Sequence, residues 1–273
     1  MQTDMWNRPD VDFVSTQDLP WAPVPGGQFG SGHGGGLRKT LSVDEEDGAR
    51  TELLAFTNRQ QGVLSAQADI FVIAGRGTVN DEPYAPGTYL HAQAMTELDW
   101  VPGVGETVLY FGPHSTPDFA AGPGAGALTV LHETRDEWVS MGWRGDEPQP
   151  ADVRIRWLRR DEAGIVFLVG MLPGYTAVNE EKHPVYEESF KIAGDLMLGR
   201  RGVVKPGGYF FRSPQTWHGP LYSRTGNLSL IRKNDFGSTD YRDPLPGHDL
   251  GSLVPAFYDR DASLTPSLGP SQR

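Results

Sequence analysis

Short apolar runs separated by polar turns follow one another along most of this chain. Residues 51–56 and 68–75 are apolar and partly β-branched, and two further runs follow at 88–92 and 107–111. Runs of four to eight residues bounded by Gly, Pro and acidic turns are typical of β-strands. The pattern therefore predicts a mostly β protein built from many short strands.

The pattern of the first half recurs in the second half. Residues 190–194 (Phe-Lys-Ile-Ala-Gly) match residues 71–75 (Phe-Val-Ile-Ala-Gly) at an offset of 119 positions. Residues 206–209 (Pro-Gly-Gly-Tyr) match residues 86–89 (Pro-Gly-Thr-Tyr) at an offset of 120 positions. Landmarks that return in the same order at nearly the same offset indicate an internal duplication.

The segments outside this repeat are rich in Gly and Pro, which disfavour regular structure. For the first segment we expect a flexible arm, and for the last an extended surface tail or a partly disordered one. The predicted divisions are an N-terminal Gly/Pro-rich arm at 1–36, a first β unit at 37–115, a connection at 116–150, a second β unit at 151–235 and a Pro-rich tail at 236–273.

Charge and composition limit the partners of the chain. A net charge of -11 over 273 residues argues against a nucleic-acid partner, because phosphate binding needs a basic face. Cysteine is absent, so a metal ion must be held by His, Asp or Glu. No apolar run reaches the roughly 18 residues that span a membrane, and the N-terminus lacks the pattern of a signal peptide. We therefore expect a cytoplasmic protein without nucleic-acid or membrane partners.

Candidate metal ligands gather just before the apolar strand of the second unit. Side chains alternate along a strand, so Glu181 and His183 point the same way, and the carboxylate of Glu187 can reach the same point. His218 arrives one hairpin later. Two imidazoles and a carboxylate leave coordination positions open, as in non-haem iron oxygenases, and the same groups also suit zinc, manganese or nickel.

The spacing of these residues resembles the two conserved motifs of the cupin superfamily. The run His183-x3-Glu187-x6-Gly194, followed by Pro214-x3-His218, is similar to the family pattern H-x-H-x(3,4)-E-x6-G with one more His after a Pro-containing turn. The resemblance implies His183, Glu187 and His218 as ligands. Glu181 stands where the family has its first His, so Glu181 is either a substitute ligand or an outward-facing acid.

The landmarks at 161–164, 173–174 and 206–209 are most similar to those in the cupin module of ChrR-type anti-sigma factors and of the dihydroxyacetophenone dioxygenase group. The resemblance covers residues 151–235 well and residues 37–115 weakly. It implies a bicupin: two tandem double-stranded β-helix, or jelly-roll, barrels with N- and C-terminal extensions. Cupins commonly pair into dimers, so the resemblance also implies a homodimer.

The repeat offsets show what the first unit contains at the ligand positions. His183 corresponds to Leu64, Glu187 to Ala68 and His218 to Leu98. None of these three side chains can bind a metal ion. We therefore expect a degenerate first barrel without a metal site and one active site in the second barrel.

The cupins that this chain resembles include dioxygenases that cleave C–C bonds of small diketone or hydroxy-ketone substrates. The resemblance thus implies an Fe(II) dioxygenase, with zinc, manganese or nickel as other possible metals. We predict Tyr209, Phe211 and Arg232 as substrate contacts, although a role in the barrel core or in an ion pair is the alternative for each. A non-catalytic metal- or ligand-binding regulatory cupin and a metal-dependent isomerase or lyase also stay open.

Overall fold

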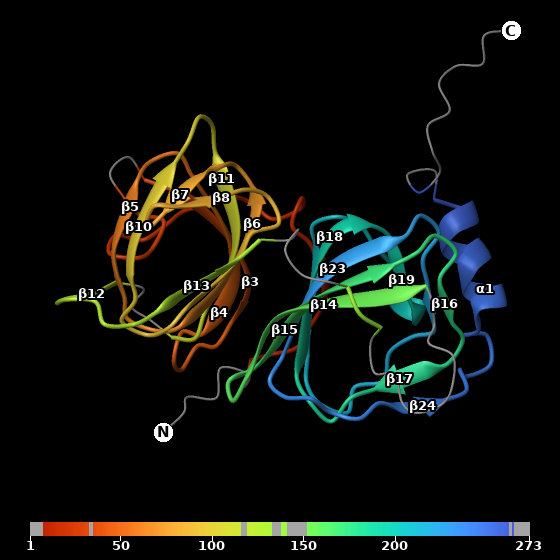
Figure 1. Ribbon diagram of the computed structural model, residues 1–273. Coiled ribbons are helices and arrows are strands. Elements are labelled where there is room, and N and C mark those ends of the chain that lie inside the picture. The colour runs from red at the N-terminus through yellow and green to blue at the C-terminus, as the bar shows by residue number, and fades with distance from the viewer. Residues whose placement is uncertain are drawn as a thin grey trace, which may run out of the picture.

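The chain folds into two β-barrels that lie side by side (Figure 1). The computed structural model describes residues 8–32, 35–115, 119–132, 138–140, 152–261 and 264. In this part of the chain no helix is long and apolar enough to cross a membrane. The expected mostly β architecture of two tandem barrels is confirmed.

Each barrel consists of a larger and a smaller antiparallel sheet. In the first barrel the larger sheet has the order β13 (Leu128–Leu131), β9 (Tyr89–Ala92), β6 (Ala68–Ala74), β11 (Thr107–Pro113), β4 (Arg50–Phe56), β3 (Leu37–Val43) and β2 (Ala22–Pro23). The smaller sheet has the order β12 (Phe119–Ala120), β5 (Gln60–Leu64), β10 (Glu97–Pro102), β7 (Gly77–Val79) and β8 (Glu82–Tyr84).

The second barrel is built in the same way. Its larger sheet has the order β1 (Val11–Ser15), β21 (Gly208–Arg212), β18 (Glu187–Gly194), β23 (Asn227–Lys233), β15 (Gly164–Met171) and β14 (Val153–Asp161). Its smaller sheet has the order β16 (Thr176–Ala177), β22 (Leu221–Tyr222), β19 (Leu196–Leu198) and β20 (Val203–Val204), and the pair β17 (Glu180–Lys182) with β24 (Asp240–Arg242) lies beside it.

The strand orders confirm the duplication predicted from the repeated landmarks. The sequence β9-β6-β11-β4-β3 in the first barrel is matched by β21-β18-β23-β15-β14 in the second. Strands β6 and β18 begin 119 positions apart, as the repeat predicts. The two halves therefore share one scaffold, and their differences lie in the side chains that this scaffold carries.

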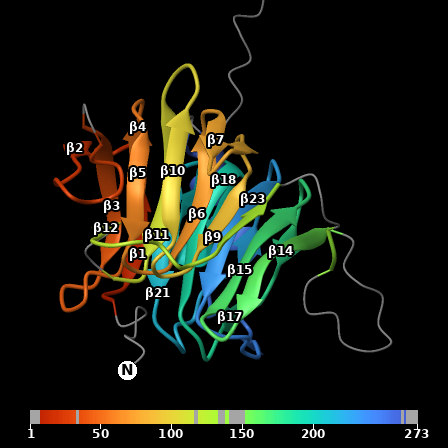
Figure 2. The same cartoon turned by 60° about the vertical axis from the view of Figure 1, so that its left-hand side comes forward.

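The two larger sheets pack face to face between the barrels (Figure 2). Apolar side chains such as Leu53 and Phe71 from the first barrel meet Phe190 and Leu230 from the second in one core. Strand β4 is consequently buried at all seven positions, because one face meets the barrel interior and the other meets the partner sheet.

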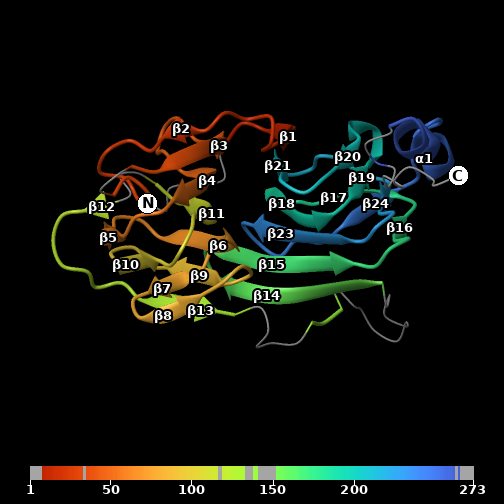
Figure 3. The same cartoon turned by 90° about the horizontal axis from the view of Figure 1, so that it is seen from above.

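The first and last described elements lie against the second barrel, whereas the rest of the predicted arm joins the first barrel through β2 and the buried Phe29. Residues 11–15, within the segment predicted to be an arm, form β1 and pair with β21 (Figure 3). In the Pro-rich C-terminal segment, α1 (Leu250–Val254) and the helical turn η2 (Pro255–Asp259) bury Leu253 and Tyr258 against Met197. The C-terminal segment therefore has more regular secondary structure than its proline content predicts, because these apolar side chains pack against β19.

Candidate metal centre

Two backbone hydrogen bonds join the two segments that carry the candidate ligands. The amide of Glu181 donates to the carbonyl of His218 at 2.7 Å, and the amide of His218 donates to the carbonyl of Glu181 at 2.9 Å. The amide of Gln215 also donates to the carbonyl of His183 at 2.7 Å. These bonds fix the register of β17 against the turn after β21, so the side chains on one face converge.

Glu181, His183 and His218 form a cluster in which one ligand atom from each residue lies within 4.8 Å of the others. Nε2 of His218 lies 3.3 Å from Oε1 of Glu181, and the two imidazole centroids are 5.3 Å apart. The alternation argument is therefore confirmed for Glu181 and His183, which do point the same way. Glu181 faces inward, not outward as the alternative interpretation had it.

Glu187 joins the edge of this cluster from the start of β18. Its Oε2 lies 3.5 Å from Nε2 of His183, and its Oε1 lies 3.6 Å from Nζ of Lys233. Burial alone would raise the pKa of Glu187, but the charges of Lys233 and the two imidazoles lower its pKa to about 2. Glu187 is therefore a carboxylate, which is the form that a metal ion requires.

The outer nitrogen of each imidazole faces an oxygen atom of the protein. Nδ1 of His218 lies 3.2 Å from the carbonyl oxygen of Thr216, which can only accept a hydrogen bond. Nδ1 of His183 lies 3.2 Å from Oγ1 of Thr239. When Nδ1 carries the proton, Nε2 presents a lone pair toward the carboxylates, and such outer hydrogen bonds commonly set the orientation of metal-binding histidines.

The four side chains fit a divalent cation. Imidazole lone pairs and carboxylate oxygens repel one another at these distances unless a proton or a cation lies between them. Oε2 of Glu187 is also buried and has no hydrogen-bond partner among the described residues. Burial would raise the pKa of Glu181, yet the hydrogen bond to His218 lowers that pKa below its usual value. Two histidines and one or two carboxylates would hold such a cation and would leave coordination positions open.

The first barrel has apolar side chains at the positions that correspond to the candidate ligands of the second barrel. Leu64, Ala68 and Leu98 are all buried in the apolar core of the first barrel. Trp100 and Phe29 fill the same interior, with ring centroids 6.0 Å apart. The expectation from the repeat offsets agrees with this packing, since none of the three positions offers a ligand atom.

Three predicted substrate contacts lie on the other face of the sheet. Tyr209 and Phe211 are fully buried between the barrels. Arg232, also fully buried, binds Asp69 of the first barrel at 3.1 Å. Strand alternation explains the difference: Glu187 opposes Arg212 and Lys233 in the sheet, whereas Glu188 opposes Phe211 and Arg232. The structure thus does not bring these three residues to the ligands.

Arg212 is the residue on the ligand face that the sequence reasoning missed. It lies directly opposite Glu187 in the β18–β21 pair and is 3% exposed. Its Cζ lies 3.8 Å from the ring centroid of Phe210, two positions earlier on the same face. Lys233 was missed as well. The expectation that Glu187 faces the ligands could have indicated both, because their positions in the strands follow from its register.

Near the cluster, Trp217 lies between two cationic side chains. Nζ of Lys182 is 5.1 Å and Cζ of Arg242 is 4.2 Å from centroids of the Trp217 rings. Both cations come from the β17–β24 pair, which pairs in antiparallel register. These contacts fix the residue that directly precedes His218.

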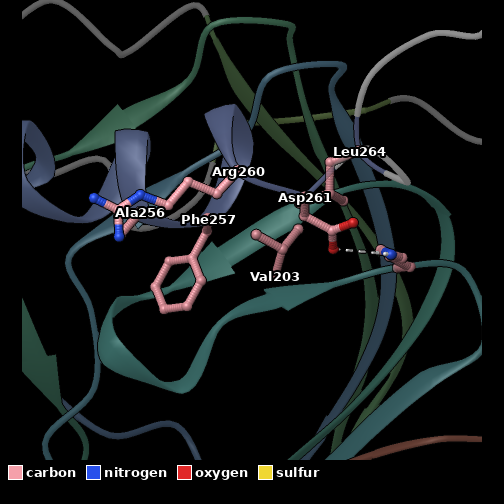
Figure 4. Close-up of a pocket in the computed structure, with 7 residues that line it drawn as sticks. Val203, Ala256, Phe257, Arg260, Asp261 and Leu264 are labelled. Atoms are coloured by element: carbon pink, nitrogen blue, oxygen red, sulfur yellow. Dashed lines mark ion pairs between the residues drawn. The ribbon is translucent and has the colours of Figure 1, made fainter.

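A separate hollow of about 420 Å³ lies between β20 and the C-terminal helical segment (Figure 4). Val203 and Phe257 contribute apolar surface to it, and Lys205 and Asp261 approach each other at 3.7 Å along its wall. The hollow shares no residue with the metal cluster. It is therefore not the site to which the ligand side chains point.

Comparisons with known proteins show the fold of this chain but do not show its family. No protein-family model matches the sequence, and no curated protein matches it. Among solved structures, a protein from Nostoc punctiforme that is assigned provisionally as a dioxygenase superposes with a TM-score of 0.75 at 17% identity, over 89% of this chain and 94% of that one.

Two further structures show how broad this fold is. HEPD from Streptomyces albus, solved with its substrate 2-hydroxyethylphosphonate and Fe(II), has a TM-score of 0.59 at 7% identity, over 87% of this chain and 78% of that one. The 11S allergen from Cocos nucifera has a TM-score of 0.51 at 11% identity, over 81% of this chain and 91% of that one. At such identities the likeness shows the fold alone.

Proposed function

We propose that this chain, which has the bicupin fold, is a non-haem Fe(II)-dependent dioxygenase with one active site in its second barrel. Its substrate is a small molecule of the diketone or hydroxy-ketone type that chelates the metal through two oxygen atoms. The ChrR-type and dihydroxyacetophenone dioxygenase groups, which the motifs resemble, are the part of the superfamily that this proposal draws on. The fold alone supports no activity, because a seed allergen shares it.

One observation carries the proposal: ligand atoms of Glu181, His183 and His218 lie within 4.8 Å of one another. Two imidazoles with a carboxylate are the ligand set of non-haem Fe(II) oxygenases, and HEPD, a protein of the same fold, binds Fe(II). We propose Glu187 as a fourth ligand, because its partly unpaired carboxylate lies 3.5 Å from His183. Such a set leaves room for a chelating substrate.

Each residue of the centre has a definable task. Bound iron supplies a place where substrate and dioxygen meet and exchange electrons. Thr216 and Thr239 hold the two imidazole rings with Nε2 inward, and Lys233 neutralises part of the charge on Glu187. His218 is buried and Glu181 and His183 are half-buried, which limits the access of bulk water and strengthens the electrostatic interactions among these groups.

The proposed reaction balances without a separate reductant. The C–C bond between a carbonyl carbon of the substrate and a neighbouring carbon that bears hydrogen breaks, together with the O–O bond of dioxygen. Each of the two carbons gains one oxygen atom, and one hydrogen of the second carbon passes as a proton to the carboxylate product. The substrate supplies all four electrons that reduce dioxygen. The chain therefore needs no second cofactor site for this chemistry.

Anaerobic loading with Fe(II) is expected to give one metal ion per chain, because the first barrel has apolar side chains at the ligand positions. Metal analysis after gel filtration measures the ratio, and an oxygen electrode then measures uptake with a panel of vicinal and 1,3-diketones and hydroxy-ketones. A chain that retains no divalent metal contradicts the proposal. Metal binding with substrate turnover but no oxygen uptake favours an isomerase or lyase, and metal binding without turnover favours a regulatory cupin.

Replacing Glu181 tests whether it is a ligand. Glu181→Ala removes one carboxylate from the cluster, so we expect Fe(II) affinity to fall about tenfold or more. Glu181→His restores the residue that the family has at this position, and we expect it to retain most of the affinity. Competition with a metal-sensitive dye measures both values. Equal affinities of the wild type and Glu181→Ala would show that Glu181 does not bind the metal.

A homodimer, which the family resemblance implies, remains a prediction. Light scattering on the eluate of a gel-filtration column gives the molar mass that decides it. A mass near the 29.9 kDa of one chain would contradict the dimer.

A further inference from the structure

Arg212 is a buried cation without a hydrogen-bond acceptor. The residue is 3% exposed, and its Nε and both terminal nitrogens have no hydrogen-bond partner among the described residues. A guanidinium group carries five N–H donors in a fixed plane. Removing all of them from water without a partner is strongly unfavourable, so a side chain in this state usually has a ligand.

Two other buried arginines of the described chain show what a structural role looks like. Arg232 and Arg159 are also nearly inaccessible, and both bind the carboxylate of Asp69. Among the described residues Arg212 forms no ion pair of this kind. Glu187 stands opposite it in the sheet, and the charges of Glu187 and Glu181 raise the pKa of Arg212 without direct contact. The carboxylate of Glu187 approaches Lys233 and His183 instead.

Arg212 lies on the face of the sheet that carries Glu187, and its charge interacts with the carboxylates of Glu187 and Glu181. Arg212 and Phe210 alternate with Tyr209 and Phe211 along β21, so both lie on the barrel-interior face that also carries Glu187. The Phe210 ring stacks on the guanidinium, with its centroid 3.8 Å from Cζ. Burial lowers the pKa of Arg212 to about 10, which still leaves it charged at neutral pH.

We propose that Arg212 binds a carboxylate group of the substrate beside the metal. The substrate class is then a small oxygen chelator with a carboxylate, of which 2-oxo acids are the simplest members. In a 2-oxo acid, the keto oxygen and one carboxylate oxygen can chelate a metal, and the second carboxylate oxygen accepts hydrogen bonds from the guanidinium. A planar guanidinium matches a planar carboxylate in this way. The inference rests on the proposed metal centre and narrows its substrate.

Pyruvate and 2,3-butanedione test the carboxylate contact. The two probes have nearly the same shape and chelate through vicinal oxygens, but only pyruvate is an anion. On protein loaded with Co(II), whose visible spectrum reports ligand binding, we expect the wild type to bind pyruvate at least about tenfold more tightly than butanedione.

The variants then separate the charge from the chelation. Arg212→Gln is expected to weaken pyruvate binding about 10- to 100-fold and to leave butanedione binding within about twofold. Arg212→Lys keeps the charge but loses the planar pair of N–H donors, so its affinity for pyruvate should lie between those of the wild type and Arg212→Gln. Arg200→Gln removes an exposed arginine on the adjacent η1 segment and should change neither affinity. Wild-type protein that prefers butanedione, or an Arg212→Gln variant with unchanged pyruvate affinity, overturns the inference.

Thermal stability gives a second readout that does not depend on the metal. A buried cation that serves to bind a ligand destabilises the folded protein when that ligand is absent. Metal-free Arg212→Met should therefore unfold at the same temperature as the wild type or at one about 2–4 °C higher. A clear fall in the unfolding temperature would show that Arg212 has a structural role and would overturn the inference.

Failure of the inference can be told apart from failure of the proposed function. Metal-loaded protein that selects pyruvate through Arg212 but consumes no oxygen with any substrate contradicts the dioxygenase and leaves the carboxylate site intact. If the wild type holds no metal, the unfolding temperature of the metal-free protein is measured with and without pyruvate. An increase that is absent in Arg212→Gln still supports the carboxylate site, and no increase in the wild type overturns it.

Discussion

Replacing Arg232 with alanine is expected to lower the free energy of unfolding by about 3–5 kcal/mol, because it leaves buried carboxylates without their counter-ion. Arg232 is 1% exposed and lies between the two barrels. Its Nε donates to Asp69 at 3.1 Å, and its NH1 forms an ion pair with Glu188. Asp69 belongs to the first barrel and Glu188 to the second, so one guanidinium joins the two.

The remaining partners of these carboxylates show why the loss should be large. The hydroxyl of Tyr209 donates to Glu188 at 2.6 Å, and that of Tyr89 donates to Asp69 at 2.6 Å. A network whose members all have partners specifies one arrangement, whereas a network that loses its central cation leaves the others poorly satisfied. Urea denaturation measures the change in free energy.

Acid unfolding adds a second measurement of the same network. Burial would raise the pKa of Asp69 and of Glu188, yet nearby cations lower both below their usual values. Arg159 and Arg232 lower the pKa of Asp69, and Arg232 and Arg8 lower that of Glu188. Carboxylates with lowered pKa values in the folded state contribute stability that is present above about pH 4 and is lost as the pH falls through the folded-state values. In Arg232→Ala these pKa values should rise, so the decline in stability below pH 4 should become shallower.

Arg59 provides the matched control for Arg232. Arg59 also pairs with an aspartate, Asp99, at 2.5 Å, but its side chain is 55% exposed. Exposed ion pairs contribute little to stability, so Arg59→Ala should leave the urea midpoint almost unchanged. A loss in Arg232→Ala no greater than in Arg59→Ala would contradict a structural role of the network between the barrels.

Strand alternation explains both what the sequence predicts well and what it predicts wrongly. The spacing of Glu181, His183 and His218 places three ligand atoms together, and the structure agrees. The predicted substrate contacts at Phe211 and Arg232 are each one position away from residues on the ligand face, Arg212 and Lys233. A shift of one residue moves a side chain to the opposite face of a strand.

The sequence pattern does not reveal this one-residue shift, because the opposite face of the sheet is also buried. A sheet with one solvated face shows polar side chains there, and the pattern then reveals which positions face inward. Strand β18 is buried at its first five positions, because the barrel interior with the candidate ligands lies on one side and the first barrel on the other. Glu187 and Glu188 are therefore both buried acids, and composition does not tell which one faces the cluster.

The repeat predicted the scaffold more reliably than the chemistry. Landmarks at matching offsets indicated two similar units, and the strand orders agree in both barrels. The charged contact between Asp69 and Arg232 joins segments 163 positions apart. No local pattern predicts such a pair, because it depends on how two complete barrels pack.

His218→Ala is expected to cause the largest loss of metal affinity, roughly 100-fold or more, since it removes a ligand and not only one of its outer partners. His218 is held through both its backbone and its ring. Its backbone pairs with Glu181 through two hydrogen bonds of 2.7 and 2.9 Å, and its Nδ1 faces the carbonyl of Thr216. Its Nε2 is therefore fixed 3.3 Å from the carboxylate of Glu181.

Metal analysis after loading with one equivalent of Fe(II) and gel filtration measures this loss. His248→Ala is the control, because His248 lies in the C-terminal segment outside the cluster and should leave one metal ion per chain. Circular dichroism checks that the barrels of His218→Ala are still folded. Thr239→Val, which removes only the outer partner of His183, should lose about 10- to 100-fold in affinity, less than His218→Ala. Full metal retention by folded His218→Ala would exclude this imidazole as a ligand and, with it, the two-histidine centre on which the proposed oxygen chemistry depends.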